Sequence, residues 1–169
     1  MKKQRTSAEV TAEKVGRNRA WPIAIIGFVL GALALTLSFE FIQLHCGLMV
    51  LLTAWAGYIC ARTILTIHPA SAGSTGRTAG MIVGFAYAIP FIIAAAQRWF
   101  NLDAAEVARR VGALTQPQVN MLAANNVIPN LDYFRAGEIS YLFGYFIFGI
   151  FLGGLMGMIG GLLARRGSR

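Results

Sequence analysis

Residues 141–164 read YLFGYFIFGIFLGGLMGMIGGLLA, and this stretch decides the fold class of the chain. It contains no charged residue, and the basic end RRGSR follows it directly. A bilayer core of roughly 30 Å is crossed by about 20 apolar residues in a helix. The stretch therefore predicts a membrane-spanning helix over residues 140–164.

Three further apolar stretches of similar length lie at residues 22–41, 46–66 and 79–97. Pro22 is expected in the first turn of the first helix, where its missing N–H does no harm. Pro90 is expected to kink the third. The connection at 40–46 is short and predicts an antiparallel hairpin, whereas 68–78, rich in Pro, Gly and Ser, is expected to be a flexible loop. We therefore expect an all-α integral membrane protein, a bundle of four transmembrane helices.

The composition agrees with this fold class. The chain has 169 residues, of which 56% are hydrophobic and 13% are charged, whereas a soluble domain is about 45–50% apolar and about 25% charged. So few charges would not cover a soluble globule. The apolar content excludes disorder, and the 2 cysteines and 5 prolines exclude a disulfide-rich scaffold and collagen.

The polar segment between the third and fourth spans is expected to be partly helical, because it is long for a structureless loop. Asp103 and Thr115 have the side chains that cap helix N-termini and precede two short helical patterns. Glu106 and Arg110 are spaced i,i+4, which favours an ion pair on a helix. Residues 127–140 are expected to be irregular.

The charges predict the orientation. Of the 15 Lys and Arg, 11 lie on the side of the two termini, and 4 lie on the side of residues 100–139. Cytoplasmic loops are enriched in Lys and Arg, so both termini are expected in the cytoplasm and residues 100–139 outside it. We therefore expect a multi-pass protein of the cell inner (plasma) membrane.

The same placement explains the net charge of +8. Residues 1–20 and 165–169 are expected to be basic cytoplasmic tails on either side of a membrane domain formed by residues 21–164. A basic tail near the membrane attracts anionic lipid headgroups. The charge is therefore interpreted as an orientation signal with anionic-lipid contact, and no nucleic-acid partner is expected.

The strongest pattern in the fourth span is a stripe of glycines. Its members are Gly149, Gly153, Gly154, Gly157, Gly160 and Gly161. At about 100° per residue they fall within an arc of about 140°, opposite the bulky residues. Small residues let helix backbones approach closely in lipid. This glycine zipper either packs the helices of one chain together or also forms an interface with another copy or subunit.

Glu40, Gln43 and His45 form a polar cluster near one membrane interface. A carboxylate beside an imidazole can relay protons or bind a metal. The alternative is that these residues lie at headgroup level and end a helical hairpin. His45 is also a candidate axial ligand for a porphyrin or chlorophyll; otherwise no cofactor and no metal are expected.

The expected function is assembly. The sequence lacks the GxxxxGK[ST], GxSxG and HExxH motifs, no carboxylate lies near the middle of a predicted span, and no enzymatic activity is expected. We expect an accessory or scaffold subunit of a membrane complex, or a homo-oligomer packed through the fourth helix; its partners are lipid and other membrane subunits or itself. The alternative is an oligomeric channel, holin-like pore or small-solute permease. Its polar lining would come from Thr36, Ser38, Thr53 and Thr63.

Overall fold

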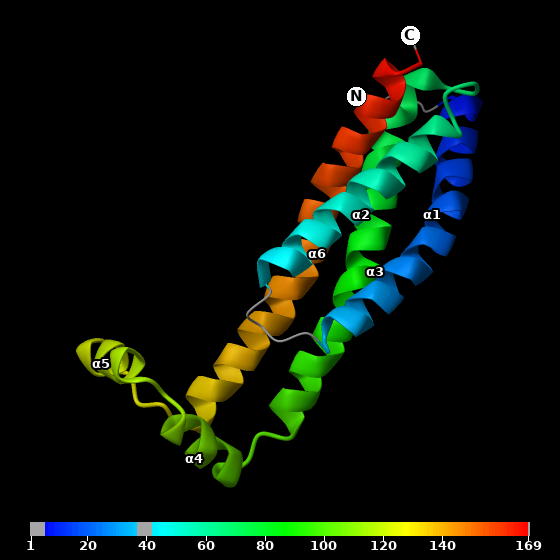
Figure 1. Cartoon of the computed structure of the whole chain (residues 1–169). Helices are drawn as coiled ribbons and strands as arrows, with labels where there is room; N and C mark the ends of the chain where they lie inside the picture. The colour runs from blue at the N-terminus through cyan, green and yellow to red at the C-terminus, as the bar shows by residue number, and fades with distance from the viewer. Residues whose placement is uncertain (1–5, 37–41, 169) are drawn as a thin grey trace. The chain divides into compact units, whose positions relative to one another are not determined.

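The computed structural model of the chain describes residues 6–36 and 42–168, without the side chains of residues 42–44. Within these ranges the structure is all-helical and has no strand. Its elements are α1 (Ser7–Ala34), α2 (Ile42–Arg62), the 3-10 turn η2 (Pro69–Ser71), α3 (Ala72–Phe100), α4 (Ala104–Gly112), α5 (Gln116–Ala124) and α6 (Leu131–Arg166) (Figure 1). Among the described residues, two helices are long and apolar enough to cross a membrane: one is α3 together with η2, and the other is α6.

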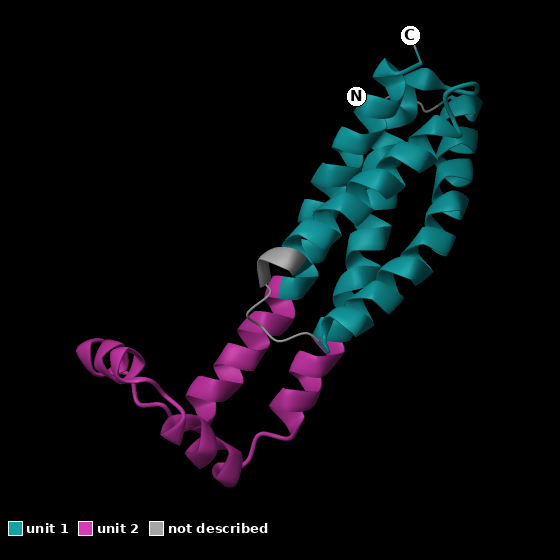
Figure 2. Ribbon diagram, in the orientation of Figure 1, with its two compact units in different colours: residues 1–91, 145–169 teal, residues 92–144 magenta. Residues whose placement is uncertain are grey.

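The chain divides into two compact units (Figure 2). Unit 1 consists of Met1–Phe91 and Tyr145–Arg169, and unit 2 consists of Ile92–Gly144. Helices α3 and α6 each run through both units. Unit 1 therefore holds α1, α2 and most of α3 and α6, whereas unit 2 holds the remaining turns of α3 and α6 together with α4 and α5.

The first helix begins much earlier than the expected residue 22. A capping box starts α1, in which Thr6 accepts a hydrogen bond from the backbone N–H of Glu9 and Glu9 accepts one from the N–H of Thr6. Such reciprocal bonds satisfy donors that a helix start leaves free. The expected polar tail is therefore helical from Ser7 onward, and Pro22 lies inside the helix rather than in its first turn. Residues 37–41 of the expected span lie outside the described residues.

The next two helices also differ from the expected bounds. Helix α2 begins and ends four residues before the expected 46–66. Helix α3 begins at Ala72, so the prediction of a flexible loop over 68–78 is wrong for most of that segment. Glycine lowers helix propensity, but Gly73 and Gly76 pack on α6 here: a methyl group built on Gly73 would lie 3.3 Å from a Leu162 methyl carbon. Tertiary packing outweighs the local preference.

Small side chains dominate the core of unit 1. The almost fully buried alanines of α1, α2 and α3 include Ala20, Ala24, Ala56 and Ala79. Helix α1 packs on α2, and it also approaches α3 closely, because a methyl group built on Gly27 would lie 3.2 Å from the Val83 carbonyl oxygen. Core side chains of this size allow short distances between helix axes.

Unit 2 confirms the two predicted short helices. Asp103 Oδ1 accepts the Glu106 N–H at 2.8 Å and caps α4. Gln118 Oε1 accepts the Thr115 N–H at 2.8 Å at the start of α5. The prediction that residues 127–140 are irregular is wrong from Leu131 onward, because α6 begins there.

Asn130 explains this early start of α6. Its side-chain oxygen Oδ1 accepts the backbone N–H of Tyr133 at 2.9 Å. This is the bond that an N-terminal cap supplies to the free donors of a helix start. The cap begins the helix in polar residues well before the apolar run.

Candidate functional site

The glycines of α6 lie against a matching ladder of glycines on α3, all within unit 1. A methyl group built on Gly157 would lie 2.6 Å from Gly80 Cα, and one built on Gly149 would lie 2.8 Å from the Gly84 carbonyl oxygen. One built on Gly76 would lie 2.9 Å from Gly161 Cα. No real side chain fits at such distances, so the two backbones touch directly over this face.

Helix α2 meets the other edge of the same arc. A methyl group on Gly160 would lie 2.9 Å from the Tyr58 backbone nitrogen, and one on Gly57 would lie 2.6 Å from Gly157 Cα. Gly154 differs from the others, because its nearest neighbour is the flexible side chain of Met81, at 2.8 Å. The glycine arc thus faces two helices of its own chain, and its use against another copy stays a prediction.

The opposite face of α6 is bulky and exposed. Phe151 is 76% exposed, and only 33% of the most apolar window of α6 is buried within the chain. Further exposed side chains on α6 in unit 1 are Ile147, Phe148, Leu155, Ile159, Leu162 and Leu163. Apolar surface of this extent is rare on a soluble monomer and marks a face covered by lipid or by protein.

The predicted polar cluster is described only in part. Glu40 lies outside the described residues, and so does the side chain of Gln43. His45 is half-buried, and its ring stands edge-on to Phe91 with 5.9 Å between the ring centroids. Its backbone carbonyl is 3.5 Å from the Tyr87 hydroxyl. Within the described residues no group of three or more His, Cys, Asp or Glu gathers at metal-binding distance.

The hydroxyls considered for a pore lining bond to their own helices. Thr53 is fully buried and donates to the Met49 carbonyl at 2.8 Å. The Thr63 hydroxyl donates to the Cys60 carbonyl at 2.7 Å, and that of Thr36 to a carbonyl one turn back at 2.6 Å. Ser38 lies outside the described residues.

Unit 2 contains a buried carboxylate that sequence patterns did not single out. Glu138, on α6, is only 4% exposed. Its Oε2 accepts from Arg98 Nε of α3 at 3.0 Å, and its Oε1 accepts from Arg110 Nη1 of α4 at 2.9 Å. A buried charge is tolerated when it is paired and hydrogen-bonded. The carboxylate therefore ties three helices of unit 2 together.

A second, more exposed carboxylate extends this network. Glu106 accepts two hydrogen bonds from Arg109, both at 2.7 Å, and one from Arg110 at 2.8 Å; the last of these confirms the predicted i,i+4 pair. The hydrogen bonds from Arg109 and Arg110 lower the pKa of Glu106 to about 2. The bond to Glu106 in turn raises the pKa of Arg109. Glu106 is thus a carboxylate across the whole neutral range.

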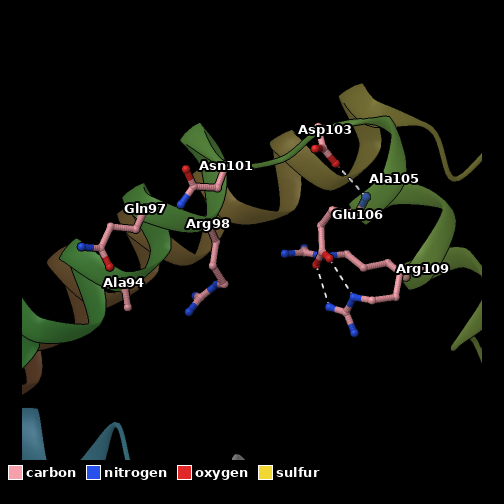
Figure 3. A pocket seen from close by; sticks show the side chains of 9 residues that line it. Ala94, Gln97, Arg98, Asn101, Asp103, Ala105, Glu106 and Arg109 are labelled. Carbon is pink, nitrogen blue, oxygen red and sulfur yellow. Dashed lines mark hydrogen bonds and ion pairs between the residues drawn. The ribbon is translucent and has the colours of Figure 1, made fainter.

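An open hollow of about 720 Å³ lies beside this network (Figure 3). Arg98 enters it from α3, and Arg109 and Glu106 enter it from α4. The full lining consists of Ala94, Gln97, Arg98, Asn101, Asp103, Ala105, Glu106, Arg109 and Arg110. The hollow is therefore polar and rich in arginine.

Trp99 and Arg135 form a separate contact in unit 2. The Arg135 guanidinium carbon lies 5.8 Å from the centroid of the Trp99 ring, a cation–π distance. The Trp99 indole nitrogen and Arg135 Nε are both buried, and neither has a hydrogen-bond partner among the described residues. The pair joins α3 to α6 within this unit.

No family model, no curated protein and no solved structure matches the chain.

Proposed function

We propose that the chain crosses the cell inner (plasma) membrane four times, through α1, α2, α3 and α6, with both termini in the cytoplasm. The length and apolarity of α3 and α6 support this topology. Helix α2 has 21 residues, and about 1.5 Å per residue gives it about the thickness of a bilayer core. The excess of 11 to 4 in basic residues supports the orientation.

The start of α1 supports contact with the cytoplasmic lipid surface. Lys14, Arg17 and Arg19 are all exposed on this helix. A basic residue near an anionic leaflet contributes about 1 kcal/mol of attraction. Anionic lipid is thus proposed as one partner of the chain.

Within this topology the chain acts by assembly, as an accessory or scaffold subunit of a membrane complex or as a homo-oligomer. One observation carries this proposal. Helix α5 buries only Leu122, while Val119 and Met121 are exposed, and Ile128 beyond it is 76% exposed. A helix of 9 residues that packs on so little is marginal by itself, because isolated helices shorter than about 12–15 residues are unstable in water.

The composition around α5 fits a protein partner. Residues 111–131 carry no charge, and the cores of protein interfaces are depleted in charged residues. Gln116 Nε2 donates to Asn120 Oδ1 at 3.0 Å on the exposed side of this helix, and the remaining polar atoms of the two amides are proposed to bond the partner beside the apolar contacts. The exposed bulky face of α6 provides a second surface, in the membrane. The pore alternative has less support, because the threonine hydroxyls bond to their own helices.

A photo-crosslinking amino acid at Met121, used in native membranes, tests this proposal. We expect an adduct either at twice the chain mass, which identifies a homo-oligomer, or with another membrane protein, which identifies a subunit. The matched control is the same group at Asp132, an exposed position in the first turn of α6, where we expect little adduct. Adducts with lipid alone, or equal adducts at both positions, would contradict the proposal.

A further inference from the structure

We propose that the arginine-lined hollow of unit 2 binds a phosphate group, held between Arg98 and Arg109. The group is carried either on a phospholipid headgroup or on a free phosphate compound. This inference does not depend on the proposed assembly.

The two arginines proposed to bind the phosphate, Arg98 and Arg109, come from different helices and are accessible to solvent. The Arg98 side chain is 36% exposed and that of Arg109 is 70% exposed. Arg98 descends from the end of α3 and Arg109 from α4, so that both guanidinium groups border the same space (Figure 3). An anion in this space is therefore within reach of cations from two sides.

The neighbouring carboxylates do not use all the N–H donors of Arg98 and Arg109. Arg98 bonds Glu138 through Nε alone, and Arg109 bonds Glu106 through Nε and Nη2. Among the described residues, both terminal nitrogens of Arg98 and the Nη1 of Arg109 make no hydrogen bond. A guanidinium offers five N–H donors in a planar fork, which matches the oxygens of a phosphate.

The arginines would hold an anion through their free donors rather than through a net charge. The lining has three arginines against Asp103 and Glu106, and the buried Glu138 carboxylate, bonded to Arg98 and Arg110, balances the third arginine. The Asp103 carboxylate caps α4, and the Glu106 carboxylate accepts three hydrogen bonds from arginines. Glu138 lines no part of the hollow; it lies buried and fixes the positions of Arg98 and Arg110.

The size and the remaining lining fit a phosphate with a substituent. A hollow of about 720 Å³ is in the range of about 300–1,000 Å³ that holds small molecules. The amides of Gln97 and Asn101 line the α3 side (Figure 3) and offer donors and acceptors to a headgroup hydroxyl or amine. Ala94, one turn before Gln97 on α3, adds an apolar wall.

Binding to the full chain in detergent tests the proposal, with one arm for each source. The first arm titrates inorganic phosphate and follows the melting temperature of the chain. The second arm adds phosphatidylglycerol or phosphatidylcholine to delipidated protein and counts bound lipids by native mass spectrometry. A rise in the melting temperature with inorganic phosphate identifies a free phosphate compound as the ligand. Retention of phosphatidylglycerol in the second arm identifies the lipid headgroup.

The decisive variant is Arg109→Gln, because this side chain is largely exposed and its loss leaves the buried Glu138 pairs in place. We expect its affinity for the ligand to fall about tenfold or more, the effect of losing a charge-assisted hydrogen bond. Arg98→Gln is expected to act in the same direction. The matched control in the inorganic-phosphate arm is Arg166→Gln, an exposed arginine at the end of α6, with unchanged affinity for phosphate. No binding by the wild-type chain in either arm, or equal binding by Arg109→Gln, would overturn the proposal.

Discussion

Three alanine substitutions along α6 separate backbone packing from helix propensity. In Gly157→Ala the new methyl group would lie 2.6 Å from Gly80 Cα and 2.8 Å from Gly80 N. In Gly154→Ala its nearest neighbour would be the Met81 side chain at 2.8 Å, whereas in Gly144→Ala it would have no neighbour within 4 Å. The same chemical change therefore meets backbone, a flexible side chain or open space.

The expected magnitudes follow from these distances. Carbon atoms pack at about 3.5–4.0 Å, so the methyl group of Gly157→Ala is about 1 Å too close and pushes α3 and α6 apart by about that much. Overpacking costs about 1–3 kcal/mol, while alanine gains about 1 kcal/mol over glycine in a helix. Because the two terms oppose each other, we expect Gly157→Ala to lower the free energy of unfolding by up to about 2 kcal/mol, and Gly144→Ala to leave it unchanged or raise it by up to about 1 kcal/mol. Gly154→Ala is expected to fall between them, because Met81 can move.

The assay is reversible unfolding of the purified chain in mixed detergent micelles, with helicity followed by circular dichroism against the fraction of denaturing detergent. The order of stability expected is Gly144→Ala, then Gly154→Ala, then Gly157→Ala. A Gly157→Ala variant as stable as the wild type, or a loss of stability in Gly144→Ala as large as that in Gly157→Ala, would contradict direct backbone contact between α3 and α6.

Three predictions concern unit 2. Glu138→Gln removes the buried charge between Arg98 and Arg110. We expect the free energy of unfolding to fall by about 2 kcal/mol, which is below the range for fully buried pairs because Arg98 is partly exposed. Amide hydrogen exchange in α4 should become faster, and unchanged exchange would contradict this prediction. The pKa of Glu106 is lowered to about 2 from an ordinary 4.5, so its stabilisation of α4 is complete above pH 4.5 and is lost as the pH falls through about 2. In Glu106→Gln the amide exchange rates of α4 should no longer show this acid dependence. The same acid profile in the variant and the wild type would argue against this role of Glu106. Asp103→Ala removes the cap of α4 and is expected to lower the stability of this helix by about 1 kcal/mol. The measurement is the exchange rate of the Glu106 amide, which should rise in Asp103→Ala and stay close to the wild-type rate in Asp103→Asn.

Local patterns in the sequence were sufficient to predict the short helices of unit 2. Three local bonds depend on residues three or four positions apart, which a sequence displays directly: the Asp103 cap, the bond from the Thr115 N–H to the Gln118 side chain, and the pair of Glu106 with Arg110. The starts of the long helices were less accessible to prediction. Residues 72–78 are rich in glycine and polar side chains, and their packing on α6 makes them helical.

The main polar network of unit 2 joins residues that are far apart in the sequence. Arg98 and Arg110 lie 40 and 28 positions from Glu138, and no spacing rule links residues so far apart. The only local signal was Glu138 close to Arg135, just before the apolar run of the fourth span. The glycine stripe, by contrast, was visible in the sequence, but the helices that it faces were not.

The proposed topology places both ends of the chain on one side of the membrane and residues 100–139 on the other, and the accessibility of single cysteines to a labelling reagent measures this directly. Single cysteines replace the exposed Ser7, Asn120 and Ser168 in a variant in which Cys46 and Cys60 are alanine. A membrane-impermeant maleimide is then applied to intact cells. We predict labelling of the cysteine at position 120 in intact cells, and of those at 7 and 168 only after the membrane is permeabilised. Labelling of all three positions from the same side would contradict the account.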